Sequence, residues 1–158
     1  MRFVNKVVVV TGAGSGIGAA TARRFSEEGA TVVLIGHHRG NIEKVAKGLS
    51  AERTVTRVAD VSKPKQVEAA IAATVKQFGS LHVLVNNAGI FKGSTVTKTK
   101  TEEWEDVIAT NAGGVFYGSR AALPHLVKTR GCIVTTASVS GLYFAHPKSQ
   151  YFAVGRTG

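Results

Sequence analysis

The distribution of apolar residues along the chain predicts five short β-strands. Each is a run rich in β-branched or other apolar residues, and most of the runs are bounded by glycine, asparagine or serine. They lie at residues 6–12, 31–36, 54–61, 81–89 and 132–138. The fourth run is nearly continuous in apolar character, which is typical of a strand covered on both faces of a parallel sheet.

Segments of helical composition separate the strands. They lie near residues 19–30, 41–50 and 62–79, with Gly29 as a stop signal for the first. Ser62 followed by Pro64 is a typical opening for the third, since serine caps a helix and proline fits its first turn. The alternation predicts a parallel sheet with helices on both faces and right-handed crossovers.

A longer helical stretch fills the space between the fourth and fifth strands. Thr99 and Glu102 have the spacing of a capping box before it. We expect interruptions at Gly113-Gly114 and at Pro124, because these residues weaken or break a helix interior.

Length and composition indicate one globular domain over residues 1–158. The 158 residues are 44% hydrophobic, which is enough to build a core. No apolar run approaches the roughly 20 residues of a membrane helix, and no signal-peptide pattern is visible, so we expect a cytoplasmic protein without a membrane partner. The single cysteine, Cys132, excludes an internal disulfide, and the scattered histidines do not indicate a metal site.

The net charge of +10 is the unusual feature of the composition. A basic surface attracts phosphates of any kind, whether in nucleic acid, membranes or cofactors. The lysines and arginines are spread along the chain, however, without a zinc-finger spacing or an aromatic RNA-binding cluster. We therefore favour solvated basic faces over a nucleic-acid site.

A glycine-rich turn joins the first strand to its helix. It reads TGAGSGIG, with Thr11 followed by Gly12, Gly16 and Gly18. This is not the Gly-x-Gly-x-x-Gly spacing, and a tight turn can need glycine for geometry alone. Its place between a strand and a helix nevertheless favours phosphate binding, because backbone N–H groups and the helix dipole meet there.

Further motifs in the same order resemble the short-chain dehydrogenase/reductase family, in its classical branch. They are the turn at 11–18, the ADV at Asp60, the NNAG at 86–89, Asn111, Ser138, and Tyr151 thirteen residues later. The likeness covers the whole chain. It implies a Rossmann-type three-layer α/β/α fold, a nicotinamide dinucleotide cofactor, a small carbonyl or alcohol substrate and a homo-oligomer.

The resemblance also implies which residues bind the cofactor: Thr11, Gly12, Ser15, Gly16, Ile17, Gly18, His37, Arg39, Asp60, Val61, Asn87, Ala88 and Gly89. Asp60 would accept a hydrogen bond from the adenine amino group, and Val61 would pack on the ring. The alternative for Asp60 is an ordinary acid at a helix entry.

The end of the second strand bears on the choice between NADP and NAD. Gly36 stands where an NAD-selective acid would bind the ribose 2′-OH, and His37, His38 and Arg39 follow. This favours NADP. Ser15 counts against it, since NADP-preferring relatives often carry a basic residue just before the middle glycine.

Asn111 falls on the apolar face of the long helix. A buried amide must be hydrogen-bonded, so we expect it to have a fixed partner. The resemblance implies support of a water-linked proton relay; the alternative is a core asparagine that holds the glycine-induced break in the helix.

The implied catalytic residues are Ser138, Tyr151 and Asn111, and the family's lysine four residues after the tyrosine is missing. Gly155 occupies that position, and Arg156 lies about 100° further round a helix. Lowering a tyrosine pKa from about 10 to about 7 requires roughly 4 kcal/mol, which nearby cations must supply. We expect impaired turnover, more for alcohol oxidation than for carbonyl reduction, because a neutral tyrosine can still donate its proton.

The family continues beyond the tyrosine, so we expect a domain that lacks its C-terminal strands and leaves the fifth strand as an open edge. Three functions remain open at this point. They are an NAD(P)-dependent oxidoreductase, an inactive dinucleotide-binding module, and a basic interaction or nucleic-acid-binding domain on an inherited fold.

Overall fold

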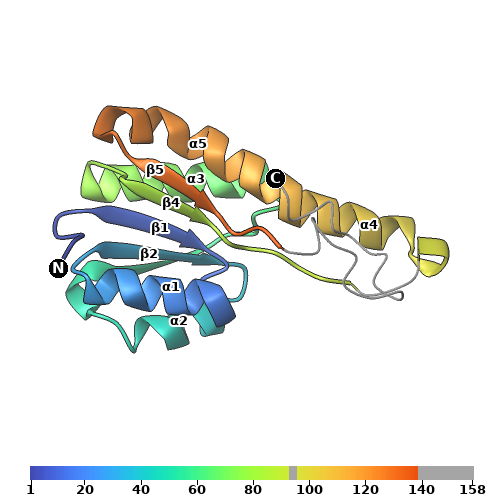
Figure 1. The fold of residues 1–158 in the computed structure, drawn as a ribbon, viewed down its shortest axis with the longest axis horizontal. Helices are drawn as coiled ribbons and strands as arrows, with labels where there is room; N and C mark the ends of the chain where they lie inside the picture. The colour runs from blue at the N-terminus through green and yellow to red at the C-terminus, as the bar shows by residue number, and fades with distance from the viewer. Residues whose placement is uncertain (93–95, 139–158) are drawn as a thin grey trace.

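The computed structural model describes residues 1–92 and 96–138 and contains one parallel sheet of five strands (Figure 1). The strands are β1 (Val7–Thr11), β2 (Thr31–Gly36), β3 (Thr54–Val58), β4 (Val83–Asn86) and β5 (Cys132–Thr135), in the spatial order β3-β2-β1-β4-β5. The order reverses between β1 and β4, which is the place where open parallel sheets of this kind bind ligands. The predicted fold class and all five strands are confirmed.

Helices cover both faces of this sheet. They are α1 (Gly16–Glu27), α2 (Arg39–Ala46), α3 (Pro64–Phe78), α4 (Thr101–Ile108) and α5 (Gly114–Thr129), with short 3₁₀ turns η1 (Ala51–Arg53) and η2 (Val96–Lys98). Figure 1 shows α1 and α2 on one face and α3 and α5 on the other. None of the helices in the described part of the chain is long and apolar enough to cross a membrane.

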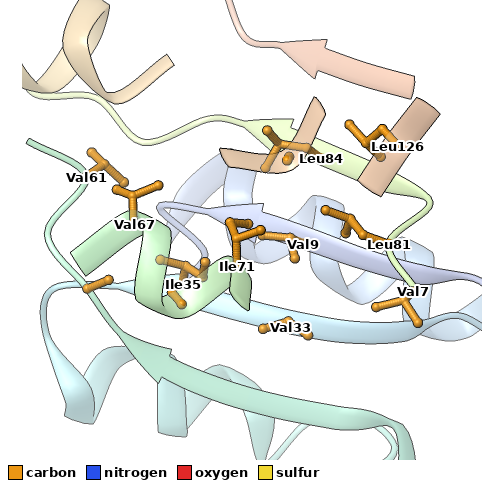
Figure 2. Packing of buried hydrophobic residues seen from close by; sticks show 13 residues of the cluster. Val7, Val9, Val33, Ile35, Val61, Val67, Ile71, Leu81, Leu84 and Leu126 are labelled. Carbon is orange, nitrogen blue, oxygen red and sulfur yellow. The ribbon is translucent and has the colours of Figure 1, made fainter. Parts of the chain in front are cut away.

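The side chains of β1 alternate between two hydrophobic clusters. Val7 and Val9 pack in the cluster beneath α3 and α5, which Figure 2 shows with Ile71 and Leu126. Val8 and Val10 belong to the opposite cluster beneath α1 and α2. Every residue of β1 is buried, and each buried valine stabilises the fold by about 1.5–3 kcal/mol. Burial on both faces explains why the run is continuously apolar.

Two helix starts differ from the prediction by one residue. The N-cap of α3 is Lys63 rather than Ser62, with Pro64 in the first turn. The N-cap of α4 is Lys100, whose backbone N–H donates to the Glu103 carboxylate at 3.2 Å. Proline at the first helical position supports α3 without a capping side chain, because its missing N–H would have no partner there.

The predicted interruptions of the long helix take a different form. Between α4 and α5 the chain forms a π-helical turn, η3 (Ala109–Gly113), so the break is one wide turn. Pro124 lies inside α5 and does not end it. Ala122 and Leu126 on either side of it are buried against the sheet, and this packing offsets the lost hydrogen bond.

The outer side of α5 and β5 exposes apolar residues. Phe116, Leu123 and Val127 on α5 are each more than half exposed, and Val134 on β5 is 50% exposed. β5 stands at the edge of the sheet in the described part of the chain. This agrees with the open edge expected from the sequence.

Candidate functional site

A cavity of about 550 Å³ opens at the carboxyl edge of the sheet. Residues that directly follow the strands form much of its wall: Gly12 after β1, His37 after β2, Ala59 after β3 and Asn87 after β4. The volume is in the range of small-molecule sites. Its position at the reversal of strand order is the one that the topology favours for a ligand.

The three motif glycines between β1 and α1 differ in what surrounds them. Gly12 has φ +64°, and a Cβ there would lie 2.7 Å from Ala88 Cα, so the turn passes the β4 loop too closely for any side chain. A Cβ on Gly18 would collide with the carbonyl oxygen of Gly12. Gly16 (φ +51°) also lines the cavity, and a Cβ there would meet nothing within 4 Å. A side chain at Gly16 would therefore meet open space at a position that borders the cavity.

Helix α1 begins at this turn and directs its first N–H groups toward the same space. Its N-cap, Ser15, makes no side-chain capping bond, and Ala19 N donates to Ser15 O at 3.1 Å as the first helical bond. The N–H groups before Ala19 lack intrahelical partners by the geometry of the helix. Ser15, Gly16 and Ile17 line the cavity, so this end can hold an anion such as a phosphate.

Thr11 lies behind the cavity wall and links the end of β1 to β4 and the loop that follows it. Only 4% of it is exposed, and it is not part of the cavity lining. Its hydroxyl accepts from Asn87 N at 3.0 Å and Ala88 N at 3.1 Å, and donates to Val85 O at 3.2 Å. Thr11 therefore positions the loop after β4 and does not itself line the cavity.

Asp60 and Val61 both line the cavity. Asp60 Oδ1 accepts from Ser62 N at 2.9 Å, and the Asp60 N–H donates to Gln66 Oε1 at 2.8 Å. Asp60 therefore makes the helix-entry contact of the alternative interpretation while it borders the cavity. Its contact with an adenine stays a prediction.

Of the two residues at the end of β2 that the sequence predicted to bind the cofactor, one lines the cavity and the other does not. His37 lines the cavity, whereas Arg39 does not; its guanidinium pairs with the Glu43 carboxylate at 3.4 Å. A Cβ on Gly36 would lie 2.8 Å from Ile42 Cγ2, and Ile42 is fully buried. An NAD-selecting acid at position 36 would therefore require the stiff, buried Ile42 side chain to shift.

Asn111 has the fixed partner that its predicted burial required. It is 5% exposed, its Oδ1 accepts from Ile90 N at 2.8 Å, and its Nδ2 donates to Ile90 O at 2.9 Å. Asn111 lies in the π-helical turn, while Ile90 and Thr110 line the cavity. It thus ties the segment after β4 to the helix, directly behind the wall.

An ion pair bounds the same side of the cavity. Lys92 Nζ donates to Asp106 Oδ2 at 2.6 Å, and both residues line the cavity. The hydrogen bond and charge of Lys92, with a smaller contribution from Lys63, lower the pKa of the Asp106 carboxyl. Figure 1 shows α4 extending past the carboxyl edge of the sheet, and Asp106 is a residue of α4 that lines the cavity.

Of the other two implied catalytic residues, only Ser138 belongs to the part of the chain that the structure describes. Ser138 is half-buried, three residues beyond β5, and is outside the cavity lining. Tyr151 lies outside the described residues, as do Gly155 and Arg156. The catalytic assignment of Ser138 and Tyr151 stays a prediction from the resemblance.

Most of the predicted cofactor residues border the cavity: Gly12, Ser15, Gly16, Ile17, His37, Asp60, Val61, Asn87, Ala88 and Gly89. Thr11, Gly18 and Arg39 do not. Sequence reasoning missed Gly14, Asn41, Ile42, Ser62, Lys63, Ile90, Lys92, Asp106 and Thr110. Several adjoin a motif residue, but only the path of α4 and the turn η3 at the sheet edge brings in Asp106 and Thr110.

Comparison with known proteins identifies the family of this chain. A family model described as short chain dehydrogenase matches residues 6–154. Meso-2,3-butanediol dehydrogenase from Serratia marcescens is 47% identical over 142 residues, and 3-oxoacyl-(acyl-carrier-protein) reductase from Thermotoga maritima is 36% identical over 162. These alignments cover 90% and 100% of this chain, but 57% and 65% of the relatives.

Solved structures agree with this result. A short chain dehydrogenase from Burkholderia cenocepacia in complex with NADP superposes with a TM-score of 0.93 at 30% identity, covering 99% of this chain and 64% of that one. Levodione reductase superposes with a TM-score of 0.90 at 35% identity, with coverage of 98% and 62%. The chain therefore spans about two thirds or less of the length of these proteins.

Proposed function

The chain belongs to the short-chain dehydrogenase family, and on that basis we propose that it binds a nicotinamide dinucleotide in the cavity and acts as an oxidoreductase on a small carbonyl or alcohol. The observation that carries the proposal is the cavity face of Gly16. It is the one place where the α1 N-terminus, a positive φ and open space coincide. These are the features that a bound pyrophosphate requires.

The cavity wall suggests how this chain holds the cofactor. The backbone from Ser15 to Ile17 would hold the pyrophosphate, Asp60 and Val61 would hold the adenine, and residues 87–89 would lie beside the nicotinamide half. When bound, the nicotinamide supplies hydride chemistry. We infer NADP rather than NAD, since Gly36 supplies no acid for a free 2′-OH.

The catalytic part of the proposal uses three residues. Tyr151 would exchange a proton with the substrate oxygen, Ser138 would orient that oxygen, and Asn111 would support proton supply from behind the wall. Gly155 offers no ammonium to lower the tyrosine pKa, so carbonyl reduction should be less impaired than alcohol oxidation. Glycine at position 155, in place of the family's lysine, also favours a second candidate function, a dinucleotide-binding module with little turnover. Assembly into a homo-oligomer remains part of the proposal.

The test is a comparison of two glycine variants. Gly16→Val should lower NADP⁺ affinity by about 100-fold or more, because the side chain would occupy the phosphate position. Gly79→Val is the matched control: Gly79 also has positive φ (+74°), also meets nothing within 4 Å, and caps α3 away from the cavity lining. Both variants should lose a similar amount of stability by urea unfolding, about 1–2 kcal/mol.

Isothermal titration calorimetry of the three proteins with NADP⁺ measures the affinity. Loss of binding in Gly16→Val alone supports the proposal. Equal affinity in the parent chain and Gly16→Val would refute the phosphate site. Steady-state turnover of the parent chain, measured in both directions, then separates the oxidoreductase from the binding module.

A further inference from the structure

A carboxylate on α4 interacts with lysines from two other segments of the cavity wall. Lys92 Nζ, in the segment after β4, donates to Asp106 Oδ2 at 2.6 Å. The second cation is Lys63, the N-cap of α3 in the segment after β3, whose charge adds to that of Lys92 in lowering the pKa of Asp106. All three residues line the cavity. Asp106 is therefore shared by two cations at the edge of the site.

The two lysines come from distant parts of the sheet edge. In the order of the strands β3 and β4 are separated by β2 and β1, so the segments that follow them begin about 14 Å apart. Gly12 and His37, which follow the two strands in between, also line the cavity. The charges of Lys63, Asp106 and Lys92 thus connect one side of the cavity with the other.

The fold does not depend on this charge cluster to hold the segment after β4. Asn111 already joins that segment to the π-helical turn, through two hydrogen bonds to the backbone of Ile90. The side chains of Lys92 and Asp106 are 38% and 61% exposed, and exposed ion pairs contribute little to the stability of a fold. Such a contact can open and close at low cost when a ligand enters or leaves.

We propose that Lys63, Asp106 and Lys92 form an electrostatic clasp that closes over the bound dinucleotide and slows its release. Asp106 is the positioning residue of the clasp, because it holds both lysines. The inference rests on the proposed function, in which Asp60 would hold the adenine and residues 87–89 would lie beside the nicotinamide half. Lys63 follows the first of these segments and Lys92 follows the second, so a cofactor bound in this way would have to leave past the clasp.

The charge of Asp106 allows a test by the sign of the effect. A dinucleotide is an anion, so removal of a nearby negative charge should by itself strengthen binding and slow release. Asp106→Asn also removes the shared partner of the two lysines, and the clasp therefore predicts faster release. Glu105→Gln is the matched control: it removes the same charge from an exposed neighbour on α4 that does not line the cavity.

The experiment separates the rate constants for association (kon) and dissociation (koff) of NADPH by stopped-flow fluorescence, with excess NADP⁺ as the displacing ligand. At low ionic strength, Asp106→Asn should raise koff about three- to fivefold and change kon less than twofold, since exposed ion pairs are worth about this factor. Glu105→Gln should leave koff unchanged or lower it. Asp106→Glu keeps the charge and should restore slow release at least in part. In 1 M salt, where the Debye length is about 3 Å, the koff values of Asp106→Asn and the parent chain should become equal.

The outcomes separate the two proposals. A koff of Asp106→Asn at or below that of Glu105→Gln overturns the clasp and leaves the proposed function standing. Faster release that persists in 1 M salt, or that Asp106→Glu shares in full, also overturns it, because the cause would then be altered packing and not lost charge. If NADPH does not bind to the parent chain, the proposed function fails and this inference falls with it.

Discussion

Asn111 provides the sharpest stability test, because its two hydrogen bonds go to a single backbone unit. Its amide accepts from Ile90 N and donates to Ile90 O, at 2.8 and 2.9 Å. Replacing it with leucine keeps a similar volume and removes both bonds. The change isolates the link between the segment after β4 and the π-helical turn.

The expected loss of unfolding free energy is about 2–4 kcal/mol. Each hydrogen bond contributes about 1 kcal/mol net, and a buried group left without a partner costs about 1–3 kcal/mol. Ile90 is half-buried and borders the cavity, so water can reach it and reduce this second cost. Values near the lower end of the range are therefore expected for Asn111→Leu.

A second substitution at Asn111 tests the same hydrogen bonds through the pH dependence of stability. Asn111→Asp keeps the acceptor for Ile90 N but, when ionised, faces Ile90 O with a second acceptor in a buried site. Burial and this carbonyl should raise the pKa of the introduced carboxyl above its unfolded value. Its stability is then fully present below the unfolded pKa and is lost as the pH rises through the folded pKa. Asn111→Asp should therefore be closer to the parent chain at pH 5 than at pH 8.

The assay is urea unfolding followed by the fluorescence of Trp104, the single tryptophan. Asn41→Leu, at an exposed asparagine on α2, is the control and should change the stability by less than about 0.5 kcal/mol. If the free energy of unfolding of Asn111→Leu lies within about 0.5 kcal/mol of that of the parent chain, the hydrogen bonds to Ile90 do not stabilise the π-helical turn.

Two further predictions concern positions away from the cavity. Burial, with a smaller contribution from Lys6, lowers the pKa of His82, whose Nδ1 accepts from Val7 N at 3.1 Å. The free energy of unfolding should therefore fall as the pH drops below about 6.5. His82→Gln should flatten this pH dependence, measured as urea midpoints from pH 5 to 8. Gly118→Ala should destabilise by about 1–3 kcal/mol, because its Cβ would lie 2.6 Å from the buried Asn86 Oδ1. Gly40→Ala, in open space on α2, should instead stabilise by about 0.5–1 kcal/mol, and equal melting temperatures for these two variants would contradict the packing argument.

The sequence alone determined the architecture. Strands buried on both faces need continuous apolar runs, and strands that alternate with helices are typical of a parallel sheet, so the order of elements could be predicted. Gly12, Gly16 and Gly18 likewise marked the turn between β1 and α1, because the positive φ of Gly12 and Gly16 and the close contacts of Gly12 and Gly18 leave few other residues possible. These signals are carried by neighbouring residues, so they can be recognised in the sequence.

Tertiary structure decided which side chains face the cavity. Arg39 and His37 are two positions apart, yet Glu43 draws the arginine along α2 while the imidazole stays at the cavity edge. Thr11 begins the glycine motif but turns to Asn87, 76 residues away in the chain. Lys92 and Asp106 meet only because α4 passes the sheet edge. Such choices depend on competing partners from distant segments, and a pattern of neighbouring residues does not encode them.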